Sequence, residues 1–246
     1  MDADWFSGKD FTSDFTSAQI KIWTQAFAPI RQRELSILEI GSWEGRSAVF
    51  FLEFFPRSRI VCVDTFAGGI DHIDSPKLAP LISGTEGRFD SNTHSYGDRC
   101  EKVKMRSLPA LDSLAQAGRR FDLVYIDGSH QRDDVLMDSL LAWGLVVDQG
   151  YIIWDDYLWG DELTPSQRPK QAIDLFLTMN DGHFELIHLG MQALVRKTPM
   201  TAPQESRIRV KVPRTFRNFA GFMAGHIQLS INAVMRLNGK NESSSQ

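Results

Sequence analysis

The sequence has few cysteines and no long apolar run. Its 246 residues include two cysteines, Cys62 and Cys100, which are too few for a disulfide framework and lack the spacing of a zinc site. Cys62 lies within an apolar run, where we expect a buried free thiol. Because no run of about 18 apolar residues occurs, we expect no transmembrane helix. The acidic N-terminal segment MDADWFSGKD does not resemble a signal peptide, so we expect a cytoplasmic protein.

The sequence also lacks a strong excess of positive charge. Its formal net charge is −4, which gives no overall reason to expect a nucleic-acid partner. The charge is unevenly distributed, because residues 201–246 carry seven basic and two acidic side chains, a net +5 that leaves −9 for the remainder. We therefore expect neither nucleic acid nor an integral membrane association, and we treat the basic C-terminal segment separately.

Short apolar runs alternate with helical patterns along most of the chain. Five runs predict buried strands, at 36–40, 59–64, 101–105, 121–126 and 149–154. Helical stretches are expected at about 17–31, 45–55, 107–117, 131–143 and 167–179. Two further runs, 183–189 and 191–196, flank Gly190 and predict an antiparallel hairpin. This alternation predicts an α/β fold with a doubly wound, mostly parallel seven-stranded sheet.

Two segments depart from this alternation. Residues 66–98 contain several glycines and prolines and are expected to be an irregular insertion. We predict one main domain over 1–198, followed by a linker at 199–213, an amphipathic helix at 214–238 and a disordered tail at 239–246. The helix could pack on its own domain, form a homodimer contact or lie on a membrane surface, and its weakly basic polar face favours the first two.

A strand, a glycine turn and the start of a helix follow one another in ILEIGSWEGRS, residues 37–47. Open α/β sheets bind ligands where the first strand ends and its helix begins. Gly41 and Ser42 form the turn, where glycine lets the backbone approach a ligand. Gly45 and Ser47 open the helix, whose free N–H groups face that ligand. Asp64 ends the next strand and can accept hydrogen bonds from both hydroxyls of a ribose.

The glycine spacing distinguishes two classes of cofactor. A dinucleotide site has the pattern G-x-G-x-x-G, which leaves room for a pyrophosphate, but the middle glycine position here is Trp43. A dehydrogenase is therefore disfavoured. Instead Glu39 precedes Gly41 by two residues, and a carboxylate there suits a ligand that bears an ammonium group. The alternative is an ordinary glycine turn with a surface glutamate and a strand-end aspartate, but the combined spacing favours S-adenosylmethionine.

The run ILEIGSWEGRSAVFFLEF resembles the first motif of class I S-adenosylmethionine-dependent methyltransferases. It is most similar to the O-methyltransferase branch that includes catechol O-methyltransferase and the macrolide-sugar and cephalosporin-tailoring enzymes. The resemblance spans about residues 35–160. Within this span lie four further blocks that resemble a small bacterial methyltransferase family: VDTFAGG, RFDSNTHSYG, YIDGSHQRDDVLMDSLLAW and IIWDDY.

Three carboxylates follow neighbouring strands of the predicted sheet. Asp127 comes directly after the run 121–126, and Asp155 and Asp156 come after 149–154. Carboxylates that converge without a local Lys or Arg repel one another. A divalent cation relieves this repulsion, and oxygen ligands favour Mg²⁺, Ca²⁺ or Mn²⁺ over zinc. We therefore expect a metal site, with Mg²⁺ favoured; the alternative is that Asp155 caps a loop and Asp156 is solvated.

The resemblance assigns further roles. It matches Asp127, Asp155 and Asp156 to metal ligands and places His130 at the position of a catalytic base, although relatives often have Lys or Asp there. His130 with Asp127 forms the expected catalytic pair, Asp127 is also counted among the cofactor-binding residues, and Ser107 matches the contact to the adenine end. His130 could instead be a plain helix N-terminal residue without a chemical role.

Several other positions carry weaker expectations. Tyr157 and Trp159 could line an acceptor pocket, and His72 and His94 could reach it from the insertion. Asp133 and Asp134 are expected to complement the dipole of the helix that they begin. Phe89, Asp90 and Asn92 belong to a motif block, but the residues alone assign them no role.

These observations leave three functional hypotheses. The first is an O-methyltransferase that uses S-adenosylmethionine and a divalent cation to methylate a hydroxyl of a small molecule, such as a sugar or natural product. The second is a metal-independent methyltransferase that uses Asp127 and His130 directly. The third is a non-catalytic protein that binds S-adenosylmethionine. The three converging carboxylates argue against the third, because a site that no longer functions has no reason to keep mutually repelling acids.

Overall fold

The computed structural model describes residues 4–199. The predicted helix and tail, the homodimer contact assigned to that helix, and all but the first residue of the predicted linker lie outside this range. None of the helices in the described range is long and apolar enough to cross a membrane.

Seven strands form one sheet in the order β3-β2-β1-β4-β5-β7-β6. β1 to β5 pair in parallel, whereas β7 is antiparallel to both β5 and β6. The bounds are β1 Ser36–Ile40, β2 Arg59–Asp64, β3 Cys100–Lys104, β4 Phe121–Ile126, β5 Val146–Trp154, β6 Phe184–Leu189 and β7 Ala193–Lys197. This confirms the predicted doubly wound, mostly parallel sheet with a C-terminal hairpin.

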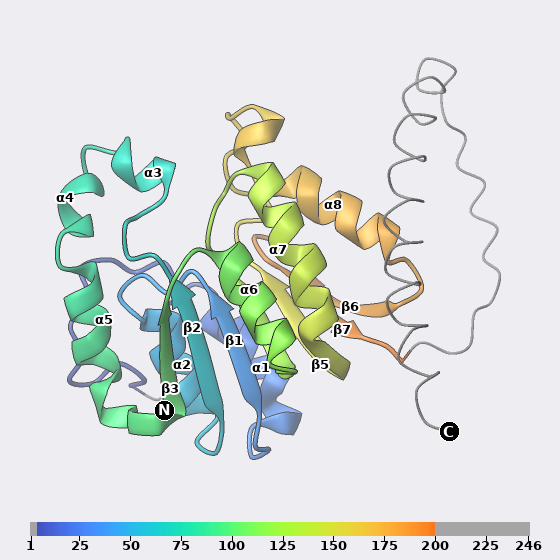
Figure 1. Ribbon diagram of the computed structural model, residues 1–246, viewed down its shortest axis with the longest axis horizontal. Helices are drawn as coiled ribbons and strands as arrows, with labels where there is room; N and C mark the ends of the chain where they lie inside the picture. Colours follow the sequence, from blue (N-terminus) through green and yellow to red (C-terminus); the bar gives the residue numbers. More distant parts are fainter. Residues whose placement is uncertain (1–3, 200–246) are drawn as a thin grey trace, which may run out of the picture. The chain divides into compact units, whose positions relative to one another are not determined.

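Alternate residues of each central strand point to opposite faces of the sheet, and both faces are covered (Figure 1). Leu38 and Ile40 of β1 pack in one cluster with residues of α6 (Ser107–Gln116), α7 (Arg132–Leu145) and α8 (Lys170–Met179). Ile37 packs in the other cluster with α1 (Ile20–Phe27) and α2 (Arg46–Phe54). Burial on both sides explains why the strands appear in the sequence as continuous apolar runs.

Two predicted elements have different bounds for local reasons. The helix predicted at 17–31 is α-helical only over Ile20–Phe27 and continues as a 3-10 turn at Ala28–Ile30, because Pro29 cannot extend an α-helix. β5 begins three residues earlier than predicted, and the left-handed backbone of Gln149 and a register shift against β4 interrupt its apolar pattern.

The prediction of an irregular segment at 66–98 was wrong. This part of the chain contains α3 (Ile70–Ile73), α4 (Ala79–Ile82), α5 (Thr85–Thr93) and a 3-10 helix (His94–Arg99). The longest of these, α5, is weakly amphipathic but buries Phe89 and Asn92 against the body of the domain. Tertiary packing therefore stabilises a helix that the local pattern did not indicate.

The sheet continues as backbone hydrogen bonds beyond the ends of its strands, and this extension positions the site. The Gly41 N–H donates to the Val63 carbonyl, the Asp127 N–H to the Ile40 carbonyl and the Asp155 N–H to the Ile126 carbonyl, at 2.9, 2.8 and 3.0 Å. The glycine turn and both acidic loops are thus fixed side by side at the carboxyl edge of the sheet, where ligands bind in folds of this type.

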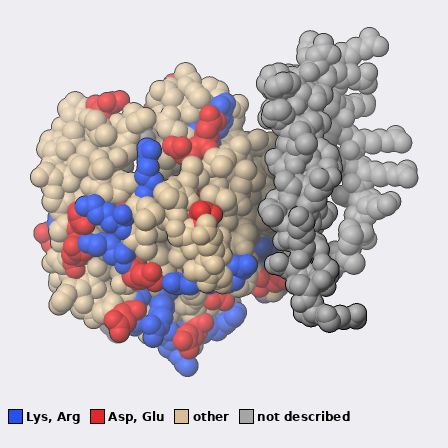
Figure 2. Space-filling view, in the orientation of Figure 1, with Lys and Arg blue, Asp and Glu red and all other residues tan. Residues whose placement is uncertain are grey.

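Figure 2 shows basic and acidic side chains interspersed over the described residues of one face, as expected from the near balance of charges. Around the β3 edge they form ion pairs: Lys102 with Glu86 and Asp90, Lys104 with Glu86, and Arg119 with Glu101. These three basic groups are therefore paired with carboxylates of neighbouring elements.

Candidate functional site

A cavity of about 1010 Å³ opens at the carboxyl edge of the sheet. Most of the predicted site residues line it: Gly41, Ser42, Ser47, Asp64, Ser107, Asp127, His130, Asp155 and Asp156. Glu39 and Gly45 lie behind its wall. A cavity of this size is at the upper end of the range of about 300–1,000 Å³ for small-molecule sites, so it has room for two ligands together.

Gly41 lies where two backbones come close. Its φ is 86°, and a Cβ atom there would meet the Asp127 carbonyl oxygen at 1.9 Å. No other residue can occupy this turn without displacing the end of β4. Asp64 holds the same turn, because its Oδ2 accepts the N–H groups of Ser42 and Trp43 at 2.7 and 2.8 Å. Its Oδ1 accepts the Phe66 N–H at 2.6 Å, so Asp64 both shapes the turn and lines the cavity.

Trp43 has a left-handed backbone, with φ of 47°, a conformation that bulky residues rarely adopt. Its indole Nε1 donates to Ser13 Oγ at 3.1 Å, and its ring stacks on His72 with centroids 4.5 Å apart. The side chain therefore joins the glycine turn to the N-terminal segment and to the insertion.

Glu39 is fully buried beneath the glycine turn. Ser47 Oγ donates to its Oε1 at 2.5 Å, whereas Glu39 Oε2 and Ser42 Oγ have no hydrogen-bond partner among the described residues. Burial raises the pKa of this carboxyl to about 7. One carboxylate oxygen and one hydroxyl without partners next to the turn fit a ligand that supplies hydrogen-bond donors and positive charge, such as the ammonium of S-adenosylmethionine.

Gly45 has a packing role that the motif did not reveal. It is the N-cap of α2, with φ of 81°, and a Cβ atom there would lie 3.0 Å from the Phe89 ring. Phe89 and Asn92, the motif residues of α5 without an assigned role, are the groups that pack against this turn: Asn92 Nδ2 donates to the Glu44 carbonyl at 3.0 Å.

Asp127, His130 and Asp156 form the reactive cluster. One possible ligand atom from each lies within 4.8 Å of the others. His130 Nε2 is 2.9 Å from Asp156 Oδ2, and the left-handed backbone of Asp156, with φ of 58°, directs this carboxylate toward the histidine. Two carboxylates and an imidazole are donors that divalent cations accept.

Asp155 lies beside this cluster and is engaged differently from the prediction. Asp155 Oδ1 accepts hydrogen bonds from Gln192 Nε2 and from the Asp156 N–H, both at 2.9 Å. Asp155 Oδ2 contacts the Tyr125 hydroxyl. The same hydroxyl lies 2.9 Å from Asp127 Oδ2. Burial, together with the charge of Asp156, raises the pKa of Asp155 to about 6, and burial with the Asp155 and Asp156 charges raises that of Asp127 well above its usual range.

The predicted adenine end of the cavity combines Ser107, the first residue of α6, with Asp138 of α7, which the sequence did not indicate. Asp138 is buried, its Oδ1 has no partner among the described residues, and burial raises its pKa to about 6. A buried acceptor here suits the amino group of a purine.

Of the residues with weaker expectations, some line the cavity and others do not. Trp159 lines the cavity, with its ring 4.4 Å from that of His130, and His72 lines it too. Tyr157 does not, because its hydroxyl bonds Asp174 and Lys170, each at 2.8 Å. His94 also lies off the wall. Asp133 pairs with Arg132, whereas Asp134 accepts Ser129 Oγ and lines the cavity.

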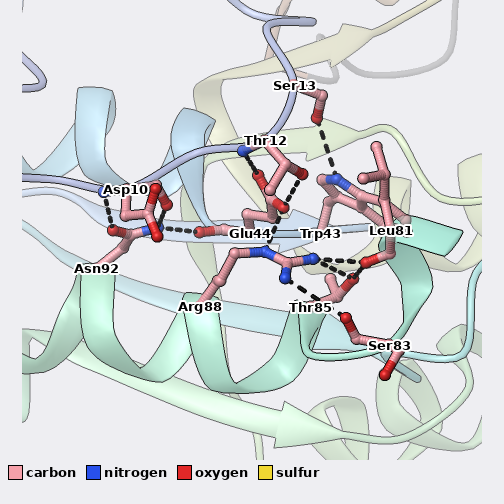
Figure 3. A network of polar contacts seen from close by, with 10 residues as sticks. All are labelled: Asp10, Thr12, Ser13, Trp43, Glu44, Leu81, Ser83, Thr85, Arg88 and Asn92. Atoms are coloured by element: carbon pink, nitrogen blue, oxygen red, sulfur yellow. Dashed lines mark hydrogen bonds and ion pairs between the residues drawn. The ribbon is translucent and has the colours of Figure 1, made fainter.

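The site also contains residues whose contacts join distant parts of the chain. Glu44, 1% exposed, accepts the Thr12 N–H at 2.7 Å and Arg88 Nε at 2.5 Å (Figure 3). Tyr125 joins the two acidic loops. Sequence spacing contains no signal for these contacts, since the partners are 32, 44 and 30 residues apart. Only the acidic character of Glu44 between two glycines hinted at a special role.

Residues 38–157 match the model of a family described as a methyltransferase domain. An uncharacterized protein of Acanthamoeba polyphaga mimivirus is 26% identical over 144 residues, which cover 54% of this chain and 58% of that protein. The described fold is similar to MycE, a methyltransferase of the mycinamycin biosynthetic pathway solved with Mg, SAH and mycinamycin VI: the TM-score is 0.54 at 19% identity, covering 78% of this chain and 53% of MycE. The chain thus spans little more than half the length of either relative.

Two shorter solved enzymes are similar over most of their length. The O-methyltransferase from Bacillus cereus, solved with SAH, gives a TM-score of 0.53 at 19% identity, covering 77% of this chain and 84% of that one. TomG from Streptomyces achromogenes, an O-methyltransferase of tomaymycin synthesis solved with SAM, gives 0.53 at 20% identity, covering 76% and 82%. Residues 38–157, just under half of the chain, thus match the model of a methyltransferase domain family, and the described chain has the Rossmann-like fold of these solved methyltransferases.

Proposed function

We propose that this chain transfers the methyl group of S-adenosylmethionine to a hydroxyl of a small molecule, such as a sugar or natural product, with the help of a divalent cation. The observation that carries the proposal is that one cavity joins the glycine turn to the cluster of Asp127, His130 and Asp156. The cofactor therefore reaches the reactive side chains without a conformational rearrangement. The chain has only two cysteines, which favours the cytoplasm as the place of the reaction.

The cofactor wall offers a distinct contact for each part of S-adenosylmethionine. Asp64 Oδ1 can accept a ribose hydroxyl, because a carboxylate has about four lone-pair sites and three backbone N–H groups use three of them. Ser42 Oγ and the buried charge of Glu39 suit the ammonium, and Ser107 with Asp138 suits the adenine. Together these contacts fix the methyl group toward Asp127.

The donor set fits a divalent cation of the Mg²⁺ type. Asp127 and Asp156 would hold it, with Asp155 beside them as the third predicted ligand, because charge repulsion among these buried carboxylates is what a cation relieves. When bound, such an ion orients a hydroxyl and lowers its pKa. Three of the solved MycE structures contain Mg, which supports this choice of metal.

His130 is the group that takes the proton. Its imidazole lies within the cluster and against the Trp159 ring, so its position is fixed from two sides. The acceptor oxygen forms a bond to the methyl carbon, the bond between that carbon and sulfur breaks, and the hydroxyl proton moves to His130. The products are a methyl ether, S-adenosylhomocysteine and a protonated imidazole.

Binding experiments test both parts of the proposal. Calorimetric titration of the full chain with S-adenosylhomocysteine should show one site, and no binding to folded protein contradicts the cofactor assignment. Titration with Mn²⁺ should show a site that Asp127→Asn and Asp156→Asn remove. Asp133→Asn, an exposed aspartate paired with Arg132, is the matched control and should retain it.

Two alternatives give different results. A metal-independent methyltransferase would bind S-adenosylhomocysteine without a Mn²⁺ site, and its rate of methyl transfer would not change with EDTA. A non-catalytic binding protein would retain both ligands and transfer no methyl group. The cluster favours the proposed enzyme over both.

A further inference from the structure

Six exposed large apolar side chains line the cavity, and the four most exposed of them lie on its outer segments rather than around the connection between β3 and α6. Phe15, Ile70, Ile73 and Met191 are 52%, 59%, 57% and 48% exposed. We call these four residues the apolar mouth. Phe15 comes from the N-terminal segment, Ile70 and Ile73 are the first and last residues of the short helix α3, and Met191 comes from the connection between β6 and β7. Exposed apolar side chains that gather from three segments around one concave site indicate a binding surface.

The apolar mouth belongs to the reactive side of the cavity. Met191 precedes Gln192, whose side chain bonds Asp155, and Gln192 also accepts the Trp23 indole N–H at 2.7 Å. Phe15 follows Ser13, which bonds Trp43. Met191 is thus the neighbour of a residue bonded to the acidic loop after β5, and Phe15 lies two residues from one bonded to the glycine turn. The mouth lines the same cavity as Asp127 and His130.

The charges of the wall exclude one class of ligand. Seven carboxyl groups and two guanidinium groups line the cavity, and no lysine of the described chain does. One of the two guanidinium groups, that of Arg46, is already paired with Asp14 at 3.1 Å. Phosphate and carboxylate ligands are bound by clusters of Arg and Lys, and this wall has no such cluster among its described residues. An anionic acceptor, such as a coenzyme A thioester or a sugar phosphate, does not fit.

A polar network fastens two of the segments that form the mouth (Figure 3). Glu44 binds Thr12 of the N-terminal segment and Arg88 of α5. Asn92 of α5 exchanges two hydrogen bonds with the Asp10 backbone, at 2.8 and 2.7 Å. The segment that carries Phe15 is therefore fixed to the insertion that carries Ile70 and Ile73. A binding surface held in this way needs little further ordering when a ligand binds.

We propose that the acceptor is a hydroxyl compound without negative charge, that it has an extended apolar portion, and that this portion binds in the apolar mouth of Phe15, Ile70, Ile73 and Met191. The hydroxyl as the reacting group rests on the proposed function. The exposed apolar side chains of the mouth support the apolar portion of the acceptor, and the excess of carboxyl groups on the cavity wall supports its lack of negative charge.

A series of alkyl glucosides tests the proposal. The full chain, loaded with S-adenosylhomocysteine and Mg²⁺, is titrated with methyl, butyl and hexyl β-D-glucoside below their micellar concentrations. The dissociation constant should fall by about fourfold for each methylene that becomes buried. Hexanoyl-coenzyme A has a chain of the same length with negative charge and should bind more weakly than hexyl glucoside. An affinity independent of chain length, or tighter binding of the coenzyme A thioester, overturns the proposal.

Matched variants locate the effect. Phe15→Ser and Ile73→Ser should each weaken hexyl glucoside binding by about fivefold to tenfold, since part of the buried apolar area is lost. Met179→Ser is the control, because Met179 on α8 is 56% exposed but lies off the cavity wall, and it should have no effect. Equal effects of all three contradict the assignment of the mouth. If S-adenosylhomocysteine itself does not bind, the proposed function fails, whereas normal binding without chain-length dependence removes only this inference.

Discussion

The cavity has two walls that are built in different ways. The cofactor wall consists of the turns that directly follow β1, β2, β3 and β4, and backbone hydrogen bonds of the sheet fix them. The acceptor wall consists of the N-terminal segment, α3 and the loops after β5 and β6, and side-chain contacts fix it. Gly41 represents the first wall, where a backbone position allows one residue type. Glu44 of the same turn shows how the second wall is attached, because its carboxylate binds Thr12 of the N-terminal segment and Arg88 of α5.

This difference explains how one fold can retain its reaction while its acceptor changes. Strand ends cannot shift without loss of the sheet, so the cofactor and the cluster that follow them are constrained by the fold. Segments that cross the edge of the sheet can change length and side chains independently, as loops on a rigid scaffold do. The separation of the two walls can be tested at the residue between them and then on each wall in turn.

The largest effect is expected at His130, where the two walls meet. His130→Gln should lower the rate of methyl transfer by about 10²- to 10⁴-fold, the usual contribution of a positioned general base. Because the imidazole contacts the reactive cluster rather than the glycine turn, the affinity for S-adenosylhomocysteine should remain unchanged. Single-turnover formation of S-adenosylhomocysteine with bound acceptor measures the first quantity, and calorimetry the second. A parallel loss of cofactor affinity would show that the two walls are not separate.

The next effect concerns the network that attaches the N-terminal segment of the acceptor wall to the glycine turn. Arg88→Met leaves the buried Glu44 carboxylate without its ion-pair partner and should lower the free energy of unfolding by about 3–5 kcal/mol. Arg119→Met is the control, since Arg119 forms an exposed pair with Glu101 at 3.2 Å, and such pairs contribute at most about 1 kcal/mol. Denaturant titration compares the two variants.

The same variant distinguishes the walls by ligand. The Glu44 network fixes the N-terminal segment to α5, so Arg88→Met should weaken hexyl glucoside binding more than S-adenosylhomocysteine binding. An equal loss of both, in protein that remains folded, would mean that the network supports the cofactor wall as well.

The sequence predicted the cofactor wall well for a physical reason. Strands buried on both faces appear as apolar runs, and the residues after them, such as Gly41, Asp64 and Asp127, lie at one edge because parallel strands end together. The acceptor wall could not be predicted in this way. Neither the pairing of Glu44 with Arg88 nor the Tyr125 hydroxyl between Asp127 and Asp155 follows from local periodicity, because these contacts depend on tertiary packing.

The helices of the insertion show the same limit. α5 has little amphipathic character, and its stability comes from Phe89 and Asn92 buried against the glycine turn. Glu39 is a more instructive case. The motif singled it out as a cofactor-binding residue, but the pattern did not show that it lies beneath the cavity wall rather than on it, and this burial determines its electrostatics.

The smallest effect, on the cofactor wall, is a pH dependence of stability caused by Glu39. Its pKa is about 7 in the folded chain and 4.5 as the ordinary value, so folding favours the protonated form. The stability that this group contributes is fully present below pH 4.5 and is lost as the pH rises to about 7, a total of about 3 kcal/mol. Glu39→Gln should remove this loss, and Glu34→Gln, which changes an exposed carboxyl, should not.

The measured quantity is the difference in free energy of unfolding between each variant and the wild type at each pH. The contributions of the other buried carboxyl groups, which the wild type, Glu39→Gln and Glu34→Gln share, cancel in this difference. Denaturant unfolding of the ligand-free proteins at intervals from pH 4.5 to 8 should show wild type and Glu39→Gln diverging toward high pH. Bound S-adenosylmethionine places its ammonium near the Glu39 carboxylate and should reduce the divergence, because an adjacent positive charge stabilises the ionised form. Parallel profiles without ligand would mean that the carboxylate is solvated. A divergence that persists undiminished with bound cofactor would mean that the ammonium binds elsewhere.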